Sequence, residues 1–197
     1  MSLMRMKQKM IWKEIQVTAK PEYKLGETVL SKEQIRERVI ELGKEISKDY
    51  TGESIYIVGI LKGAFVFMAD LVREIDADVE LDFMIVSSYG NSTESSGTVK
   101  IEKDLDRSTE GKNILIVEDI IDTGTTLKYL RDHYFANKLA KSVKIVTLLS
   151  KPARRTADIE PDYIGFEIED KFIIGCGLDY AEKYRQLPDI LHLVEDK

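Results

Sequence analysis

Hydrophobic residues near the start of the chain recur with the spacing of an α-helix. Ile35, Val39, Leu42 and Ile46 stand three or four residues apart, so they share one face of a helix. Ser31 comes shortly before them, and a glutamine follows that serine three residues later, which is the pattern of a capping box. We therefore expect an amphipathic helix that begins directly after this serine.

Continuous apolar runs further along the chain predict strands that are buried on both faces. Two such runs, 54–60 and 80–89, are separated by an apolar helical segment at 63–75. The remaining predicted strands are 113–117, 142–150 and 163–168, and a further helix is expected at 125–139. Apolar strands that alternate with helices are typical of parallel sheets. The expected fold class is α/β, with a mostly parallel five-stranded sheet and helices on both faces.

A segment of small and polar residues interrupts this alternation after the second predicted strand. Its sequence, GNSTESSGTVKIEKDL at 90–105, is rich in glycine, serine and threonine. This composition predicts a long loop or a hairpin.

Composition and charge narrow the classes of function. The 197 residues are 43% hydrophobic and 32% charged, which fits one globular domain with a sizeable core. The net charge of −6 argues against general binding to nucleic acid or to an anionic membrane, because both need a basic surface. No apolar stretch is long enough to span a membrane, and the opening MSLMRMKQKMIW has no signal-peptide core.

The few cysteine and histidine residues exclude several kinds of site. Cys176 is the only cysteine and cannot form an internal disulfide, so we expect a protein of the reducing cytoplasm. Its apolar and glycine neighbours favour a packed thiol over a nucleophile. His133 and His192 are the only histidines and lack metal-ligand spacing, which argues against a zinc site or a histidine-based triad.

Two adjacent acids follow the third predicted strand, where a ligand is expected in an open α/β sheet. Glu118 and Asp119 come directly after NILIV, and the loop 122–126, DTGTT, opens the next helix. Two carboxylates about 6 Å apart repel by about 3 kcal/mol at an effective dielectric near 20, so a divalent cation or hydroxyl donors would relieve them. The loop offers N–H groups, hydroxyls and a glycine at a helix N-terminus, which predicts a cradle for one phosphate.

Other interpretations of this stretch explain less of it. The letters DTG also occur in aspartic proteases, but there they lie in a β context and need a second copy, whereas here they occur once and precede a helix. A Walker A loop requires GxxxxGK[ST], which is absent. A simple helix cap explains one aspartate or threonine but not the neighbouring pair of acids.

The stretch VEDIIDTGTTL, residues 117–127, closely resembles the phosphoribosyl-pyrophosphate-binding signature of type I phosphoribosyltransferases. Further segments in the same order extend the likeness over about residues 20–192: LKGAFVF, SSYGNSTESSGTVKI, LLSKPARR and PDYIGFEIEDKFIIGCGLDYAEKYR. The last of them narrows the resemblance to the hypoxanthine-guanine phosphoribosyltransferase family, the 6-oxopurine branch.

The resemblance implies a single domain over 1–197, with a core at about 30–165 and a small hood over the base from about 1–29 and 166–197. It implies purine salvage, in which hypoxanthine or guanine and phosphoribosyl pyrophosphate give IMP or GMP and pyrophosphate with Mg²⁺. A homo-oligomer, dimer or tetramer, is typical of the family. Two alternatives stay open: a xanthine-preferring relative, and a pyrimidine-operon regulator that has the same fold and binds RNA.

The resemblance also implies roles for residues around the signature. Glu118 and Asp119 would bind the ribose hydroxyls and help to place magnesium. The 5′-phosphate would be held by Asp122, Thr123, Gly124, Thr125 and Thr126. Asp122 would also act as the general acid/base at the purine N7.

Residues on other segments are assigned to pyrophosphate in the same way. Lys62 and Gly63 would bind it through a loop that often contains a cis peptide in this family. Arg185 would grip its oxygens, because a guanidinium can bind phosphate bidentately. Ser88 and Tyr89 belong to the segment expected to close over the site and exclude water.

The base site is implied by three further positions. Lys151 would donate to the 6-oxo group, Phe172 would stack on the purine, and the backbone of Ile173 would meet the 2-position. Asp179 beside them would meet a second magnesium ion.

Overall fold

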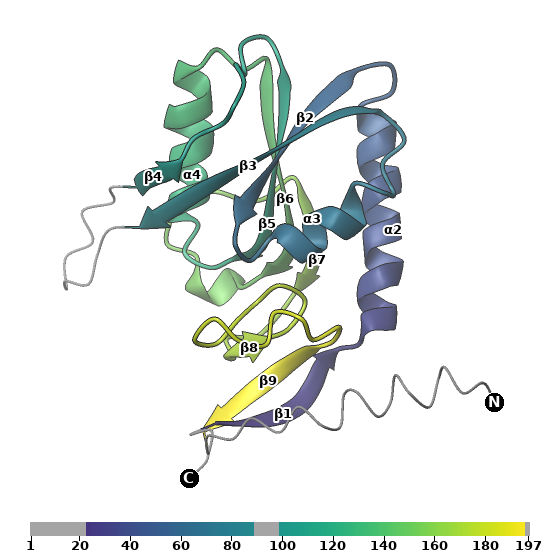
Figure 1. Ribbon diagram of the computed structural model, residues 1–197, viewed down its shortest axis with the longest axis vertical. Helices are drawn as coiled ribbons and strands as arrows, with labels where there is room; N and C mark the ends of the chain where they lie inside the picture. Colours follow the sequence, from purple (N-terminus) through teal and green to yellow (C-terminus); the bar gives the residue numbers. More distant parts are fainter. Residues whose placement is uncertain (1–22, 89–98, 196–197) are drawn as a thin grey trace.

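The computed structural model describes residues 23–88 and 99–195 of the chain (Figure 1). Within them, a six-stranded sheet has the order β4-β3-β2-β5-β6-β7. Its strands are β2 (Ser54–Leu61), β3 (Asp78–Ser88), β4 (Val99–Lys103), β5 (Asn113–Ile121), β6 (Ser142–Ser150) and β7 (Tyr163–Glu167). All neighbours pair in parallel except β3 and β4. The expected mostly parallel sheet is confirmed, and β4 from the segment 90–105 adds an antiparallel edge strand.

Helices cover both faces of this sheet, as expected (Figure 1). One face carries α2 (Lys32–Asp49) and α3 (Phe65–Leu71), and the other carries α4 (Thr125–Tyr129) with the π-helical turn Leu130–Phe135 that continues it. The capping box at the start of α2 is present, because Ser31 and Gln34 each bond the other's backbone N–H. Within the described residues, none of the helices combines the length and apolar character needed to cross a membrane.

The core is divided by the sheet into two hydrophobic clusters. Alternate residues of β2 face opposite sides, so Ile55 and Ile57 join the cluster under α2 and α3, and Val58 and Ile60 join the one under α4. Every residue of β2 from Ile55 to Ile60 is buried. The run of uninterrupted apolar residues in the sequence therefore reflects a strand that is covered on both faces.

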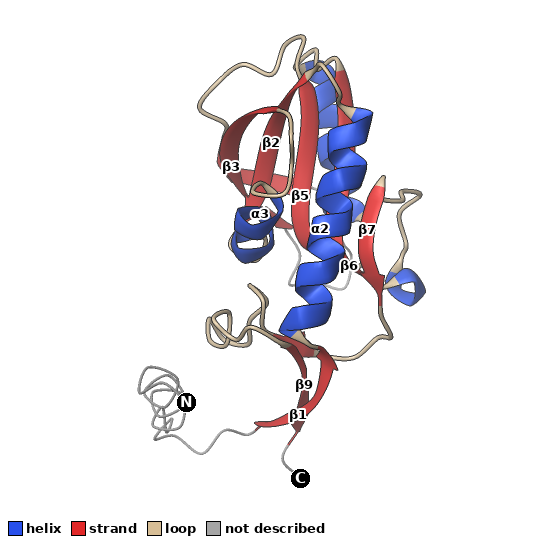
Figure 2. Ribbon diagram, turned by 90° about the vertical axis from the view of Figure 1, so that its right-hand side faces the viewer, coloured by secondary structure: helices blue, strands red, loops and turns tan. Residues whose placement is uncertain are grey.

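A second, smaller sheet brings the two ends of the described chain together. It consists of β1 (Tyr23–Leu30), β9 (Ile190–Glu195) and β8 (Ile173–Ile174), in the order β1-β9-β8 and antiparallel throughout. This sheet lies beyond one end of the large sheet (Figures 1 and 2).

Several predicted boundaries were wrong, and three elements differ most. The helix expected at 63–75 is α3, which ends at Leu71. The chain turns more tightly there, because the Glu74 N–H donates to the Leu71 carbonyl, three residues earlier, at 2.9 Å. The helix expected at 125–139 leaves α-geometry after Tyr129 and becomes π-helical. The strand expected to end at residue 117 continues to Ile121, because β6 pairs alongside it as far as Ser150.

Gly43 provides a test of how tightly α2 packs against the segment after α3. An added Cβ at this position would lie 2.5 Å from both the Cβ and the carbonyl oxygen of Glu74. We expect Gly43→Ala to destabilise the protein by about 2 kcal/mol, because overpacking outweighs the roughly 1 kcal/mol gain in helix propensity. Urea denaturation measures this change, with the exposed Lys44→Ala as a control on the same helix. A stabilised Gly43→Ala protein would contradict the packing.

Candidate active site

The loop after β5, which is predicted to hold a phosphate, borders a small hollow. Gly124 has φ +80° and ψ −5°, in the left-handed region that favours glycine, and it precedes the first residue of α4. A hollow of about 120 Å³ lies beside it and is lined by Glu118, Asp122, Thr123, Gly124 and Thr126 with three apolar residues. Thr125 is exposed and does not line this hollow. The structure thus brings together five of the predicted phosphate and ribose residues.

Glu118 and Asp119 lie within β5 and not after its end, which corrects the expected position. Neighbouring strand residues point to opposite faces, so the two carboxylates do not face one another. Glu118 lines the hollow, whereas Asp119 lies against Gly63, where an added Cβ would overlap its Oδ2 atom. The acid pair is therefore divided between two sides of the sheet.

The pKa values of both carboxyl groups are raised, so both lose their protons less readily than usual. Burial raises the pKa of Glu118 well above its usual range, and the charge of Asp119 adds to this effect. Burial raises the pKa of Asp119 to about 6, although its Oδ1 accepts a hydrogen bond from Ile120 N–H at 2.8 Å and Arg185 opposes the shift. A nearby cation or hydroxyl donors would favour the charged forms.

Asp122 presents a carboxylate that the protein leaves largely uncompensated. Its Oδ1 is buried and has no hydrogen-bond partner among the described residues. Its Oδ2 lies 3.8 Å from Arg154 Nε, which is too long for a hydrogen bond. A buried acceptor without a donor is costly, and a hydrogen bond from a ligand would relieve this cost.

The loop between β2 and α3 approaches this site from the next strand. A cis peptide joins Leu61 and Lys62, as the resemblance implied. The backbone at Gly63 is also tightly enclosed, since an added Cβ at Gly177 would overlap the Gly63 carbonyl oxygen. Lys62 is exposed and pairs with Glu182 at 2.9 Å.

Asp179 and Arg185 form an ion pair instead of standing free. Arg185 Nη2 lies 2.8 Å from Asp179 Oδ1, and its Nη1 donates to the Gly177 carbonyl at 2.8 Å. The other Asp179 oxygen accepts from Glu182 N–H at 2.8 Å. The charges of Arg185 and Asp179 shift the pKa of Asp119 in opposite directions, so this ion pair lies close to Asp119.

Two residues assigned to the base, Lys151 and Phe172, have the opposite exposure to that expected for a surface lysine and a core phenylalanine. The side chain of Lys151 is only 8% exposed, and its Nζ donates to the Lys171 carbonyl at 2.7 Å and lies 3.5 Å from Asp170. Phe172 is 52% exposed and meets Tyr180 edge to face at 5.7 Å. A solvated loop lysine and a core phenylalanine would show the reverse pattern. Ile173 is buried.

Two predicted residues cannot be placed in full. Ser88 ends β3, but its side chain lies outside the described part of the structure. Tyr89 lies outside the described residues altogether.

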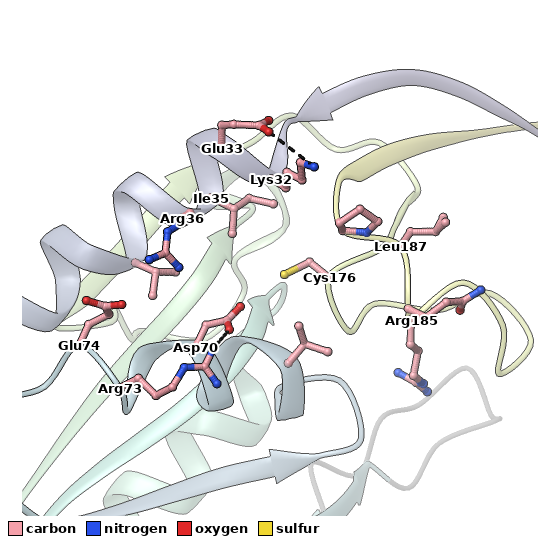
Figure 3. A pocket seen from close by; sticks show the side chains of 14 residues that line it. Lys32, Glu33, Ile35, Arg36, Asp70, Arg73, Glu74, Cys176, Arg185 and Leu187 are labelled. Atoms are coloured by element: carbon pink, nitrogen blue, oxygen red, sulfur yellow. Dashed lines mark hydrogen bonds and ion pairs between the residues drawn. The ribbon is translucent and has the colours of Figure 1, made fainter. Parts of the chain in front are cut away.

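A larger cavity, of about 440 Å³, lies elsewhere in the described structure (Figure 3). It is enclosed by the first turns of α2, by α3 and by residues 185–188, and Arg185 is the one predicted site residue that lines it. Cys176 also lines this cavity, and burial raises the pKa of its thiol to about 12. The thiol is therefore protonated at neutral pH and packed, as expected.

Comparison with known proteins agrees with this geometry. The model of the family described as "Phosphoribosyl transferase domain" matches residues 26–181. The chain belongs to the phosphoribosyltransferase family.

Individual relatives narrow the likeness within this family. The hypoxanthine-guanine phosphoribosyltransferase of Bacillus subtilis (strain 168) is 56% identical over 84% of this chain and 92% of its own length. The enzyme of the same name from Streptococcus thermophilus is 51% identical over 85% of this chain and 93% of its own. A crystal structure of a hypoxanthine phosphoribosyltransferase from Staphylococcus aureus superposes with a TM-score of 0.83, at 50% identity over 86% of this chain and 91% of its own.

The acids of β5 in this phosphoribosyltransferase fit a divalent metal that is shared with substrate. Within the described residues, no group of three or more His, Cys, Asp or Glu side chains could hold a metal by itself. An unpartnered buried oxygen remains on Glu118, one of the residues predicted to place the metal. Mg²⁺ is usually bound by one or two carboxylates together with substrate phosphates, and this donor set suits that mode.

Sequence reasoning missed two arginines that contact Asp122. Arg154 lies between Asp122 and Asp170, at 3.8 and 3.4 Å, and Arg155 donates to the backbone of Asp122. The segment LLSKPARR already carried the resemblance, so its two arginines were the available signal. Their different roles depend on contacts with residues far away in sequence and could not be read from it.

The raised pKa of Asp119 predicts that the folded protein loses stability as the pH rises. Between about pH 4 and 6 the folded protein holds a proton on Asp119 that the unfolded chain has released, so the free energy of unfolding falls as pH rises through this window. We expect Asp119→Asn to stabilise the ligand-free protein at pH 8 by up to about 3 kcal/mol, and by almost nothing below pH 4.

Chemical denaturation at both pH values measures this difference. Asp78→Asn, at an exposed carboxylate, is the control and should leave stability unchanged. An Asp119→Asn protein that is equally destabilised at both pH values would show that the burial cost is wrong.

Proposed function

We propose that this chain is a hypoxanthine-guanine phosphoribosyltransferase, which joins a 6-oxopurine to phosphoribosyl pyrophosphate and releases pyrophosphate. One observation supports it most. A chain of charged contacts runs from Asp122 through Arg154 and Asp170 to Lys151, at 3.8, 3.4 and 3.5 Å. It places a buried ammonium donor near the loop that would hold the 5′-phosphate. A phosphorylated sugar and a base with an acceptor oxygen could therefore be bound side by side.

The sugar phosphate is assigned to β5 and the loop after it. Glu118 and Asp119 would accept hydrogen bonds from the ribose hydroxyls, which would relieve the cost of their buried charge. Backbone N–H groups and hydroxyls at residues 123–126 would bind the 5′-phosphate at the start of α4. Glu118 and Asp119 are the residues on β5 that would hold Mg²⁺, and the ion would supply charge neutralisation for the departing pyrophosphate.

Lys151 supports a preference for 6-oxopurines. Its ammonium has only donors, so it can satisfy a 6-oxo group but not the 6-amino group of adenine. A buried donor that is left facing another donor rejects the wrong base strongly. The exposed ring of Phe172 offers a surface on which the purine can stack, with the Ile173 backbone toward its 2-position.

Asp122 is proposed to accept the proton from the purine N7 as the base attacks C1 of the ribose. Its unpartnered Oδ1 is the acceptor available for this proton. The departing pyrophosphate would be met by Gly63, Lys62 and Arg185. To bind pyrophosphate, Arg185 would break or weaken its ion pair with Asp179. The Asp179 carboxylate would then be available to a second magnesium ion.

Other parts of the assignment stay predictions. Ser88 and Tyr89 are the expected lid residues, and a homo-oligomer, dimer or tetramer, in the cytoplasm is the expected state of the protein.

A panel of bases tests the proposed function. Hypoxanthine, guanine, xanthine, adenine and uracil are each supplied with phosphoribosyl pyrophosphate and Mg²⁺, and release of pyrophosphate is followed. We expect turnover with hypoxanthine and guanine and at least about 10⁴-fold lower kcat/KM with adenine. Preference for xanthine would assign the chain to the xanthine branch. No turnover, together with salt-dependent binding of RNA, would favour the regulator.

Asp122→Asn tests the acid/base assignment. We expect the fold and the binding of phosphoribosyl pyrophosphate to persist while kcat falls by about two to four orders of magnitude, the range for general acid–base catalysis. Rapid-quench measurement of nucleotide formation checks this value. Asp158→Asn, at an exposed position near the same loop, is the control and should keep full activity. Full activity in Asp122→Asn would refute the role.

A further inference from the structure

Arg155 lies behind the phosphate loop with a guanidinium that is almost completely enclosed. Its side chain is 8% exposed and its Nη1 donates to the backbone carbonyl of Asp122. Its Nη2 donates to Ser150 Oγ at 2.9 Å, and its Nε lies 3.7 Å from Glu160. Ser150 is the last residue of β6 and Asp122 follows the last residue of β5. One side chain therefore ties together the ends of two adjacent strands.

The residues after Arg155 continue this attachment. The N–H groups of Thr156 and Ala157 both donate to the Thr123 carbonyl, at 3.1 and 3.0 Å. Segment 155–157 thus engages two consecutive carbonyls of the phosphate loop, those of Asp122 and Thr123.

Peptide geometry makes these bonds informative about the other face of the loop. In a trans peptide the carbonyl and the following N–H point in opposite directions. With the Asp122 and Thr123 carbonyls directed at segment 155–157, the N–H groups of Thr123 and Gly124 are directed away from it. The hollow is lined by both of these residues and by none of the residues 155–157. Two successive N–H groups facing one hollow form a binding site for an anion.

Packing fixes the distance between the two segments. A Cβ added at Gly124 would lie 2.6 Å from Ile159 Cγ2 and 3.1 Å from Arg155 Cδ. The phosphate loop therefore packs directly against residues 155–159. It cannot change its conformation without displacing them.

We propose that Arg155 is a positioning residue for phosphoribosyl transfer. By holding the Asp122 carbonyl, it directs the Thr123 N–H toward the 5′-phosphate and anchors the residue that carries the acid/base carboxylate. This inference rests on the proposed function, and it predicts that Arg155 governs the binding of the sugar phosphate without touching it.

Arg155→Gln removes the double anchor, and Arg155→Lys keeps the charge but can reach only one of the two acceptors. We expect both variants to raise KM for phosphoribosyl pyrophosphate, Arg155→Gln by about 10- to 100-fold, because small misplacements of binding groups have costs of this size. KM for hypoxanthine should stay within about twofold. Direct titration should show the same loss for ribose 5-phosphate and none for pyrophosphate.

Arg38→Gln is a matched control. The Arg38 guanidinium, like that of Arg155, anchors backbone, because it donates to the carbonyls of Ile164 and Gly165 in β7 at 2.8 and 3.1 Å. The Arg38→Gln substitution should lower the midpoint temperature of unfolding without changing KM for either substrate. If Arg155→Gln does not fold, Arg155→Lys carries the test.

The outcomes separate the inference from the proposed function. An equal rise of both KM values, or a lower midpoint alone, would make Arg155 merely structural and overturn the inference. A wild-type protein that turns over no base would refute the proposed function. The titration with ribose 5-phosphate would still decide whether Arg155 orients an anion site.

Discussion

The carboxylate of Asp119, the backbone of Gly63 and the backbone of Gly177 are stacked without room for a single additional carbon atom. These contacts join β5, the loop after β2 and the loop that leads from β8 toward β9. Any side chain at either glycine would separate the strand that carries the acids from the loops that face it. The pyrophosphate side of the proposed site exists only because these three segments touch.

This close packing also creates the electrostatic cost of the site. Asp119 is buried by the same contacts, so its pKa rises to about 6, and Glu118 on the opposite face resists ionisation for the same reason. A protein selected for stability alone would replace these acids. A ligand that brings hydroxyl groups and a cation favours both charged forms, so the free energy lost in the empty site is recovered on binding.

Local patterns predicted the elements that are governed by local rules. The spacing of Ile35, Val39, Leu42 and Ile46 predicted α2, because one face of a helix must meet the sheet. The same reasoning stopped β5 too early, since its apolar run ends at Glu118 while pairing with β6 continues. Pairing depends on a partner strand, and no local pattern reports it. The cis peptide and the phosphate loop were expected only through resemblance or motif, and the order of the strands was not predicted at all.

The two adjacent arginines show why the rest of the site could not be read from sequence. Arg154 is 48% exposed, and its contacts with Asp122 and Asp170, at 3.8 and 3.4 Å, are long enough for a ligand to replace them. The side chain of Arg155 is only 8% exposed and donates to the backbone carbonyl of the same aspartate. Asp122 thus has a fixed main chain and a loosely held carboxylate. The proposed proton transfer between Asp122 and a bound base requires this combination, because the group must be positioned in advance and yet remain free to change partners.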